Sequence, residues 1–244
     1  MAVSFGEQIH ALTGFDGDSA SSSEIGENYD DVTAEWMNSA VREVVNILPP
    51  ELKQKCSKVT NLYISNTDTT MDLDGVGEIL YVTRENANSG YYIGCREVNP
   101  IYADSANDSS SLHYATATDP VYWTESNSSG NPTLFVKPTP DANQPAKIMH
   151  ISYPVFDADG SGSNINIKTA TSIANFPDEA ENLVVLRAAI TAAEYLLAIE
   201  EDVELYIPII SSLKAQYQEG VYALKFGQFS PTKKDIRIAQ QGGQ

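Results

Sequence analysis

The most constraining feature of this sequence is that the spacing of its apolar residues changes twice along the chain. From residue 32 to 48, and again from 178 to 217, apolar residues recur at three- and four-residue steps, which is typical of helices with one buried face. Between residues 59 and 153 the apolar residues instead form short runs, rich in Val, Ile, Thr and Tyr and separated by Asn, Ser, Gly and Asp. This pattern predicts an α+β fold: a helical bundle from the N- and C-terminal parts, with an inserted antiparallel β domain.

The strongest helical signal lies in the last third of the chain. Pro177 and Asp178 precede a long run rich in Ala and Leu, and proline and acidic residues are favoured in the first turn of a helix. A second amphipathic segment, residues 202–217, follows at once, with Val203, Ile207, Ile210, Leu213 and Tyr217 on one side. We expect the two helices to pack antiparallel and to bury Leu186, Ile190, Leu197 and Ile210.

Strands are predicted where the short runs fall, at residues 59–65, 76–84, 91–98, 112–118, 121–125, 133–136 and 147–153. The last two runs are joined by a segment that contains Pro138, Pro140, Asp141 and Pro145. Proline fixes φ and lacks a backbone donor, so these residues belong in a loop or at strand ends. We therefore predict a hairpin with a proline-stiffened loop.

These patterns give expected domain boundaries. Residues 1–58 and 166–220 form the helical bundle, residues 59–165 the β-rich insertion, and residues 221–244 a C-terminal extended arm. The arm has too few apolar residues for a core of its own, yet it holds large aromatic and basic side chains, and exposed aromatics normally mark a contact surface. The expected contact residues of the arm are Tyr222, Lys225, Phe226, Phe229, Lys233, Lys234 and Arg237.

The net charge of −18 argues against a nucleic-acid-binding surface, because DNA binding needs Lys and Arg to replace the counterions of phosphates. It argues equally against docking on anionic membranes. We find no apolar stretch that approaches the length of a membrane span and no secretory signal at the start of the chain. The two cysteines, Cys56 and Cys95, are expected to be free thiols in a reducing compartment.

No catalytic motif is present, and the three histidines are scattered over different predicted elements. Two calcium-like stretches fail the spacing of an EF-hand loop: the loop from Asp157 has Lys168 at its twelfth position, and the one from Thr70 ends at Tyr81. We predict no enzyme activity, no metal and no cofactor. Two alternatives stay open: a carbohydrate-binding or other recognition module built on Trp36 and Trp123, and a hydrolase with paired carboxylates.

The order of several motifs resembles a known family. Leu134, Val136, Pro138 and Pro140 form an "L-x-V-x-P-x-P" run, and a strand ending in Tyr153-Pro154 follows it. An Asp/Ser-rich link then leads to an "FPDE" helix start at residues 176–179 and a long Ala/Leu helix. Over residues 30–220 this order resembles the head-to-tail adaptor (connector) proteins of tailed bacteriophages, and most nearly the short-tailed-phage adaptor, or tail tubular protein A, type.

The resemblance implies a structural protein of the virion neck, assembled in the host cytoplasm. Such adaptors form a cyclic ring of about twelve copies between the portal protein and a downstream tail or nozzle protein. DNA passes through the channel of the ring without specific binding, which suits an acidic chain, and no membrane is involved. The arm residues would then contact the portal or a neighbouring copy, and the proline-rich hairpin would project toward a neighbour or the tail.

Overall fold

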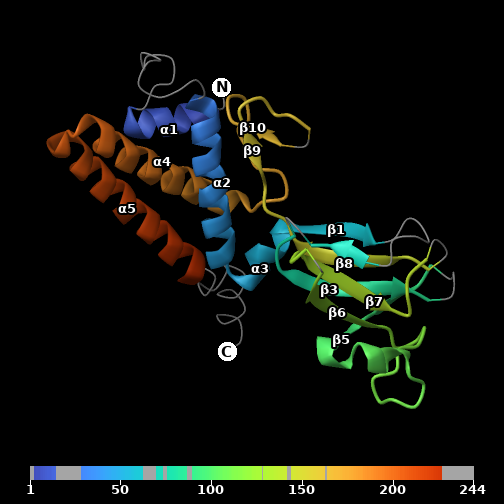
Figure 1. Ribbon diagram of the computed structural model, residues 1–244. Helices are drawn as coiled ribbons and strands as arrows, with labels where there is room; N and C mark the ends of the chain where they lie inside the picture. The colour runs from blue at the N-terminus through green and yellow to red at the C-terminus, as the bar shows by residue number, and fades with distance from the viewer. Residues whose placement is uncertain are drawn as a thin grey trace, which may run out of the picture. The chain divides into compact units, whose positions relative to one another are not determined.

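The chain folds into two units. The structure is a computed structural model that describes residues 3–14, 29–62, 70–73, 76–86, 90–127, 129–141, 144–162 and 164–226. One unit consists of Met1–Cys56 and Pro154–Gln244, and the other of Ser57–Tyr153. Helices at both ends and antiparallel sheets between them confirm the predicted α+β fold with an inserted β domain (Figure 1).

The second boundary of the insertion lies at Tyr153 rather than at residue 165. The residues after Tyr153 return to the helical unit because β9 (Phe156–Asp157) and β10 (Ile165–Asn166) pair with each other in parallel, outside the two larger sheets. Asn38 fixes β9 to the helices, since its side chain accepts a hydrogen bond from the Phe156 N–H at 2.7 Å and donates one to the Phe156 carbonyl at 3.0 Å.

The helical unit contains α1 (Phe5–Thr13), α2 (Tyr29–Ile47), α3 (Pro50–Lys53), the 3-10 turn η1 (Gln54–Cys56), α4 (Asp178–Glu200) and α5 (Val203–Phe226). A capping box at Ser4 and Glu7 begins α1, and Gly14 ends it in the left-handed conformation. The break between α2 and α3 follows from Pro49 and Pro50, because a proline ring clashes with the preceding helical turn.

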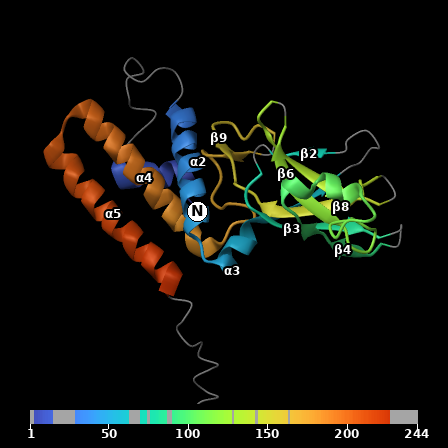
Figure 2. The ribbon, with the colours of Figure 1, turned by 60° about the horizontal axis from the view of Figure 1, so that its bottom comes forward.

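Helix α4 is the core helix of this unit and packs against α1, α2 and α5 (Figures 1 and 2). An 18-residue window within α4 has a mean hydropathy of 1.6, so by length and composition alone the helix could cross a membrane, and the expectation that no stretch approaches a membrane span is wrong. However, 56% of that apolar window is buried inside the structure, as in a core helix. The buried residues are Ala180, Leu183, Val184, Val185, Leu186, Ala188, Ala189, Ile190, Ala192, Ala193 and Leu196.

Helix α5 lies alongside α4 in the opposite direction (Figure 1) and is buried on one side only, through Tyr206, Ile210 and Leu213. Leu186, Ile190 and Ile210 are buried as predicted, whereas Leu197 is only half-buried. Val203 and Ile207, which were expected on the packed side, are exposed. Tyr206 lies between them in the same turns and is 5% exposed, so the buried face of α5 runs through Tyr206, Ile210 and Leu213 and leaves Val203 and Ile207 on its flank.

The β unit consists of two four-stranded sheets, in the orders β1-β8-β3-β4 and β2-β7-β6-β5. The strands are β1 (Ser57–Leu62), β2 (Thr70–Asp72), β3 (Ile79–Glu85), β4 (Tyr92–Gly94), β5 (Arg96–Glu97), β6 (Val121–Ser126), β7 (Pro132–Lys137) and β8 (Ala146–Ile151). Apolar residues from both sheets form a common core, in which Val82 and Ile148 of one sheet join Leu134 and Val136 of the other. The two sheets therefore pack face to face.

Three strand predictions are wrong. Residues 91–98 are not one strand but divide into β4 and β5, which belong to different sheets. Strands β7 and β8 do not form a hairpin, because β7 pairs with β2 and β6 in one sheet while β8 pairs with β1 and β3 in the other. The proline-rich segment is thus a connection between sheets. Residues 112–118 form turns instead of a strand, and with the 3-10 turns η2 (Pro100–Tyr102) and η3 (Asp104–Asn107) they build a long excursion between β5 and β6.

Candidate interaction surfaces

The side chains that could bear chemistry are used inside the fold. Among the described residues, no group of three or more His, Cys, Asp or Glu side chains could hold a metal ion. The Asp157 carboxylate accepts hydrogen bonds from the Ser161 hydroxyl at 2.8 Å and the Asn164 amide at 3.1 Å, and these hydrogen bonds lower its pKa. The calcium-like loop is therefore a turn organised by its own aspartate.

The tryptophans do not form a binding platform. Trp123 is buried and stacks on Phe135, with ring centroids 5.4 Å apart. Trp36 is half-buried and packs against Tyr195 of α4 at 5.4 Å. Among the histidines, His150 is buried between the Thr60 hydroxyl at 3.1 Å and the Ile151 carbonyl at 3.0 Å. These groups therefore stabilise the packing of the two units.

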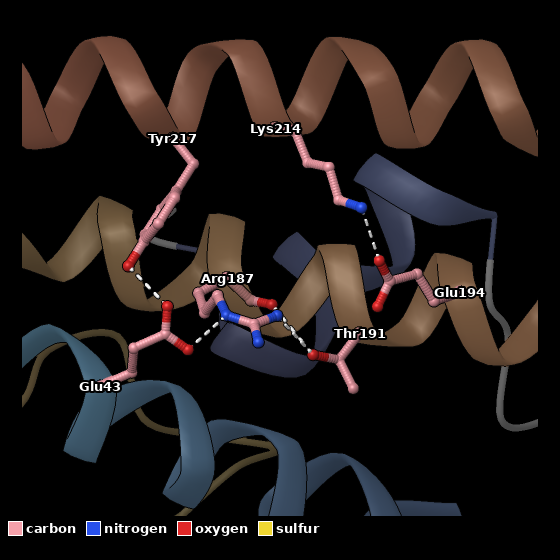
Figure 3. Close-up of polar contacts among 6 residues, drawn as sticks. All are labelled: Glu43, Arg187, Thr191, Glu194, Lys214 and Tyr217. Atoms are coloured by element: carbon pink, nitrogen blue, oxygen red, sulfur yellow. Dashed lines mark hydrogen bonds and ion pairs between the residues drawn. The ribbon is translucent and has the colours of Figure 1, made fainter.

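A polar network joins α2, α4 and α5 into one rigid support (Figure 3). Glu43 of α2 accepts a hydrogen bond from Arg187 Nε of α4 at 2.6 Å and another from the Tyr217 hydroxyl of α5 at 3.2 Å. Arg187 also donates to Thr191 Oγ1 at 3.0 Å. One carboxylate thus bridges all three helices and fixes the side of α5 that faces α4.

Because of this network, the stability of the helical unit should fall as the pH rises through the alkaline range. Burial, and then the charge of Glu43, raise the pKa of Tyr217 from 10.0 to about 12. Because the folded state holds this proton more tightly, its contribution is complete below pH 10 and is lost as the pH rises toward 12. Denaturant unfolding measured between these pH values should therefore show a shallower loss of stability in Tyr217→Phe than in the wild type. Equal pH slopes would contradict this role of Tyr217.

The turn between α4 and α5 forms a surface that we call the acidic tip, residues 199–207. Ile199, Val203, Leu205 and Ile207 are between 41% and 59% exposed. Four carboxylates lie among them, from Glu200, Glu201, Asp202 and Glu204, and the tip has no Lys or Arg. Asp202 Oδ1 accepts from the Leu205 N–H at 3.0 Å, and Glu200 accepts from the Tyr206 hydroxyl at 2.6 Å, so the backbone of the tip is ordered.

At the C-terminal end of α5, the prediction of an extended arm that begins at residue 221 is wrong. Tyr222, Lys225 and Phe226 belong to α5 and not to an extended segment, because the helix continues through Phe226. Tyr222 and Phe226 are 66% and 54% exposed, and their ring centroids lie 4.5 Å apart. The remaining predicted contact residues, Phe229, Lys233, Lys234 and Arg237, lie outside the described residues.

The proline-rich connection is less exposed than a projecting hairpin requires. Pro140 is buried, whereas Pro138, Asp141 and Pro145 are half-buried. Asp141 Oδ1 accepts a hydrogen bond from the Gln144 N–H at 2.8 Å, and the two residues also form an isolated antiparallel bridge. Burial lowers the pKa of the nearby Arg84 guanidinium, and the negative charge of Asp141 opposes that effect. The predicted projecting hairpin is therefore a partly buried connection between the two sheets.

The excursion between β5 and β6 is a second exposed apolar surface. Ile101 and Leu112 lie on its outside, and Leu112 is 97% exposed. Tyr102 stacks on His113 at 4.2 Å and so brings the two parts of the excursion together. Neither this surface nor the acidic tip is among the surfaces predicted from the sequence, although acidic and aliphatic residues alternate in "IEEDVELYI".

The comparisons with known proteins agree with surfaces built for assembly. The family model described as SU10 adaptor protein matches residues 17–228, which include the whole β unit and the helical unit from α2 to α5, but not α1. No curated protein matches the chain. The family match supports the phage adaptor suggested by the motif order, with a structural role in the virion. The chain therefore belongs to the SU10 adaptor protein family.

Proposed function

We propose that this protein forms the head-to-tail adaptor ring of a phage, of the short-tailed type, which connects the portal to the tail and lines part of the DNA channel. The family match over residues 17–228 carries the proposal, because it includes the helical unit and the β unit alike. The helical unit would face the portal and the β unit the downstream tail or nozzle protein. A cyclic ring of about twelve copies needs heterologous contacts between neighbours. The exposed apolar residues of the acidic tip and of the excursion between β5 and β6 could make such contacts.

The charge of the chain supports a passage for DNA. A net charge of −18 gives a phosphate backbone no site for counterion release. Carboxylates along a channel repel phosphates over a Debye length of about 8 Å at physiological salt. DNA would therefore move through such a ring without binding to it, while the same charge would keep the unassembled chains apart in solution.

The experiment that tests this function uses purified portal rings and imaging by negative stain. The wild-type protein is expected to add an end-on ring of density to each portal. The absence of any ring or portal attachment at high protein concentration would overturn the proposed function.

A deletion tests the role of the C-terminal segment. Removing residues 227–244 leaves all of α5 in place, so the melting temperature should stay close to that of the wild type. Attachment to portal rings should be lost, because the removed residues include Phe229 and the three basic residues Lys233, Lys234 and Arg237. The readout is co-sedimentation with portal rings.

A charge-matched control accompanies the deletion. The deletion removes three basic residues and Asp235, a net loss of +2. The double variant Arg42→Gln, Lys58→Gln loses the same net charge from two exposed positions of the described fold. This control should attach like the wild type. Unchanged attachment of the deletion variant would show that the C-terminal segment is only a spacer.

A further inference from the structure

The acidic tip exposes aliphatic and acidic side chains together on an ordered turn. Exposed aliphatics at this density mark a contact surface, and the surrounding carboxylates select a basic partner. Asp202 and Glu200 are engaged within the turn, whereas Glu201 and Glu204 are exposed and can meet a cation without breaking a hydrogen bond that shapes the tip. The tip therefore suits a peptide that combines large apolar groups with Lys and Arg.

The chain itself contains such a peptide, the basic segment, residues 222–238. It begins with the exposed pair Tyr222 and Phe226 and continues into residues beyond the described part of α5. Its further apolar residues are Phe229, Ile236 and Ile238, and its charged residues are Lys225, Lys233, Lys234, Arg237 and Asp235. Four basic residues and one acidic residue give a net charge of +3, against four carboxylates on the acidic tip.

We propose that the basic segment of one copy docks on the acidic tip of a second copy. This inference rests on the proposed ring and names a contact that would hold neighbouring subunits together. The two surfaces lie at opposite ends of α5, so each copy offers one of each. Such a contact is heterologous, and its repetition closes a ring where the rotation between copies allows it.

The residues exposed along α5 disfavour docking of the basic segment on the acidic tip of the same copy. Helix α5 has 24 residues and is about 36 Å long. A segment that folded back to its own tip would cross the exposed polar residues Gln218, Lys214 and Ser211. No large apolar side chain is exposed on α5 between Ile207 and Tyr222, and Lys214 is already paired with Glu194 at 2.8 Å, so this stretch offers the aromatic and aliphatic groups of a returning segment no apolar contact. Docking on another copy avoids this path.

The test measures binding of a fluorescently labelled peptide, residues 222–244, to the full-length protein by anisotropy. The wild type is expected to bind saturably, with an affinity that falls as salt is raised. Glu201→Lys with Glu204→Lys should weaken binding at least about tenfold, and Leu205→Ser with Ile207→Ser should do the same. Leu112→Ser is the matched control, since it removes a fully exposed leucine from the β unit, and should bind like the wild type.

A charge exchange gives the second measurement. The peptide with Lys233→Glu and Lys234→Glu should bind the Glu201→Lys, Glu204→Lys protein better than it binds the wild type. Lack of saturable binding at concentrations up to about 1 mM, a Kd in the range of incidental contacts, would overturn the proposal. Equal effects of the tip variants and of Leu112→Ser would overturn it as well.

Full-length chains distinguish docking between copies from docking within one copy. Self-association is measured by sedimentation velocity for two full-length variants, one with Lys233→Glu and Lys234→Glu and one with Glu201→Lys and Glu204→Lys. Each variant alone should self-associate less than the wild type. A mixture of the two should recover association. Recovery only when one chain carries all four changes would place the contact within a single copy and overturn the proposal. Rings on portals without peptide binding would refute this contact alone and leave the proposed function standing.

Discussion

Leu186→Asp is expected to unfold the helical unit under conditions in which the wild type is folded. Leu186 lies on α4, is 4% exposed, and belongs to the side chains buried between α4 and its neighbouring helices. An aspartate there would place an unpaired charge in an apolar environment, and the loss of apolar contact would add to that penalty. We expect a loss of about 3–5 kcal/mol in the free energy of unfolding.

The matched control is Leu205→Asp, the same substitution at a position that is 49% exposed on the acidic tip. It should change stability by no more than about 0.5 kcal/mol, because the carboxylate stays in water. Urea unfolding followed by circular dichroism measures both variants, and the two units call for a fit that allows two transitions. A wild-type transition in Leu186→Asp would mean that α4 is not packed as described.

Gly77→Ala is expected to destabilise the β unit by about 2–3 kcal/mol through overpacking. A Cβ atom at Gly77 would lie 2.6 Å from the Ile151 carbonyl oxygen and 2.9 Å from Cε2 of Tyr153. The Gly77 N–H also donates to that carbonyl at 3.0 Å, so the backbone cannot move away without losing a hydrogen bond. A methyl group at Gly77 would therefore push the end of β8 away from the residues that lead into β3.

Gly94→Ala is the control, because a Cβ atom there meets nothing within 4 Å and its backbone is not in the left-handed region. Alanine restricts the unfolded chain, so this variant should be neutral or slightly more stable than the wild type. Thermal unfolding of the two variants checks the difference. The close approach at Gly77 is contradicted if both substitutions have the same effect.

Sequence periodicity predicted the elements that use one buried face. The face that contains Leu186 and Ile190 was recognisable because helical spacing follows from packing against a core. The run at residues 112–118 was misassigned because its β-prone residues stand in turns, where Asp108 and Ser111 provide local hydrogen bonds to the backbone. Composition alone does not separate these two uses of a short run.

The pairing of strands was beyond the reach of local pattern. Strands β7 and β8 are neighbours in sequence, yet the apolar side chains of each meet across the core from opposite sheets. The alternation of apolar and polar residues along a strand predicts which side chains point into the core, but not which other strand it pairs with. The exposure of Val203 and Ile207 has a similar reason, since helical spacing groups them with Ile210, and only the packing against α4 shows that the buried face runs through Tyr206 instead.

The pairing of Ser57 with Ile151 has a consequence for how such a protein can change over time. These residues stand opposite each other on adjacent strands, at the points where the chain enters and leaves the β unit. Because the two ends of the inserted β unit lie on paired strands, the helical unit needs only two chain ends about 5 Å apart to accommodate it. The helical unit can therefore accept a different domain in the same place without a change in its own fold, so the two units can vary independently of each other.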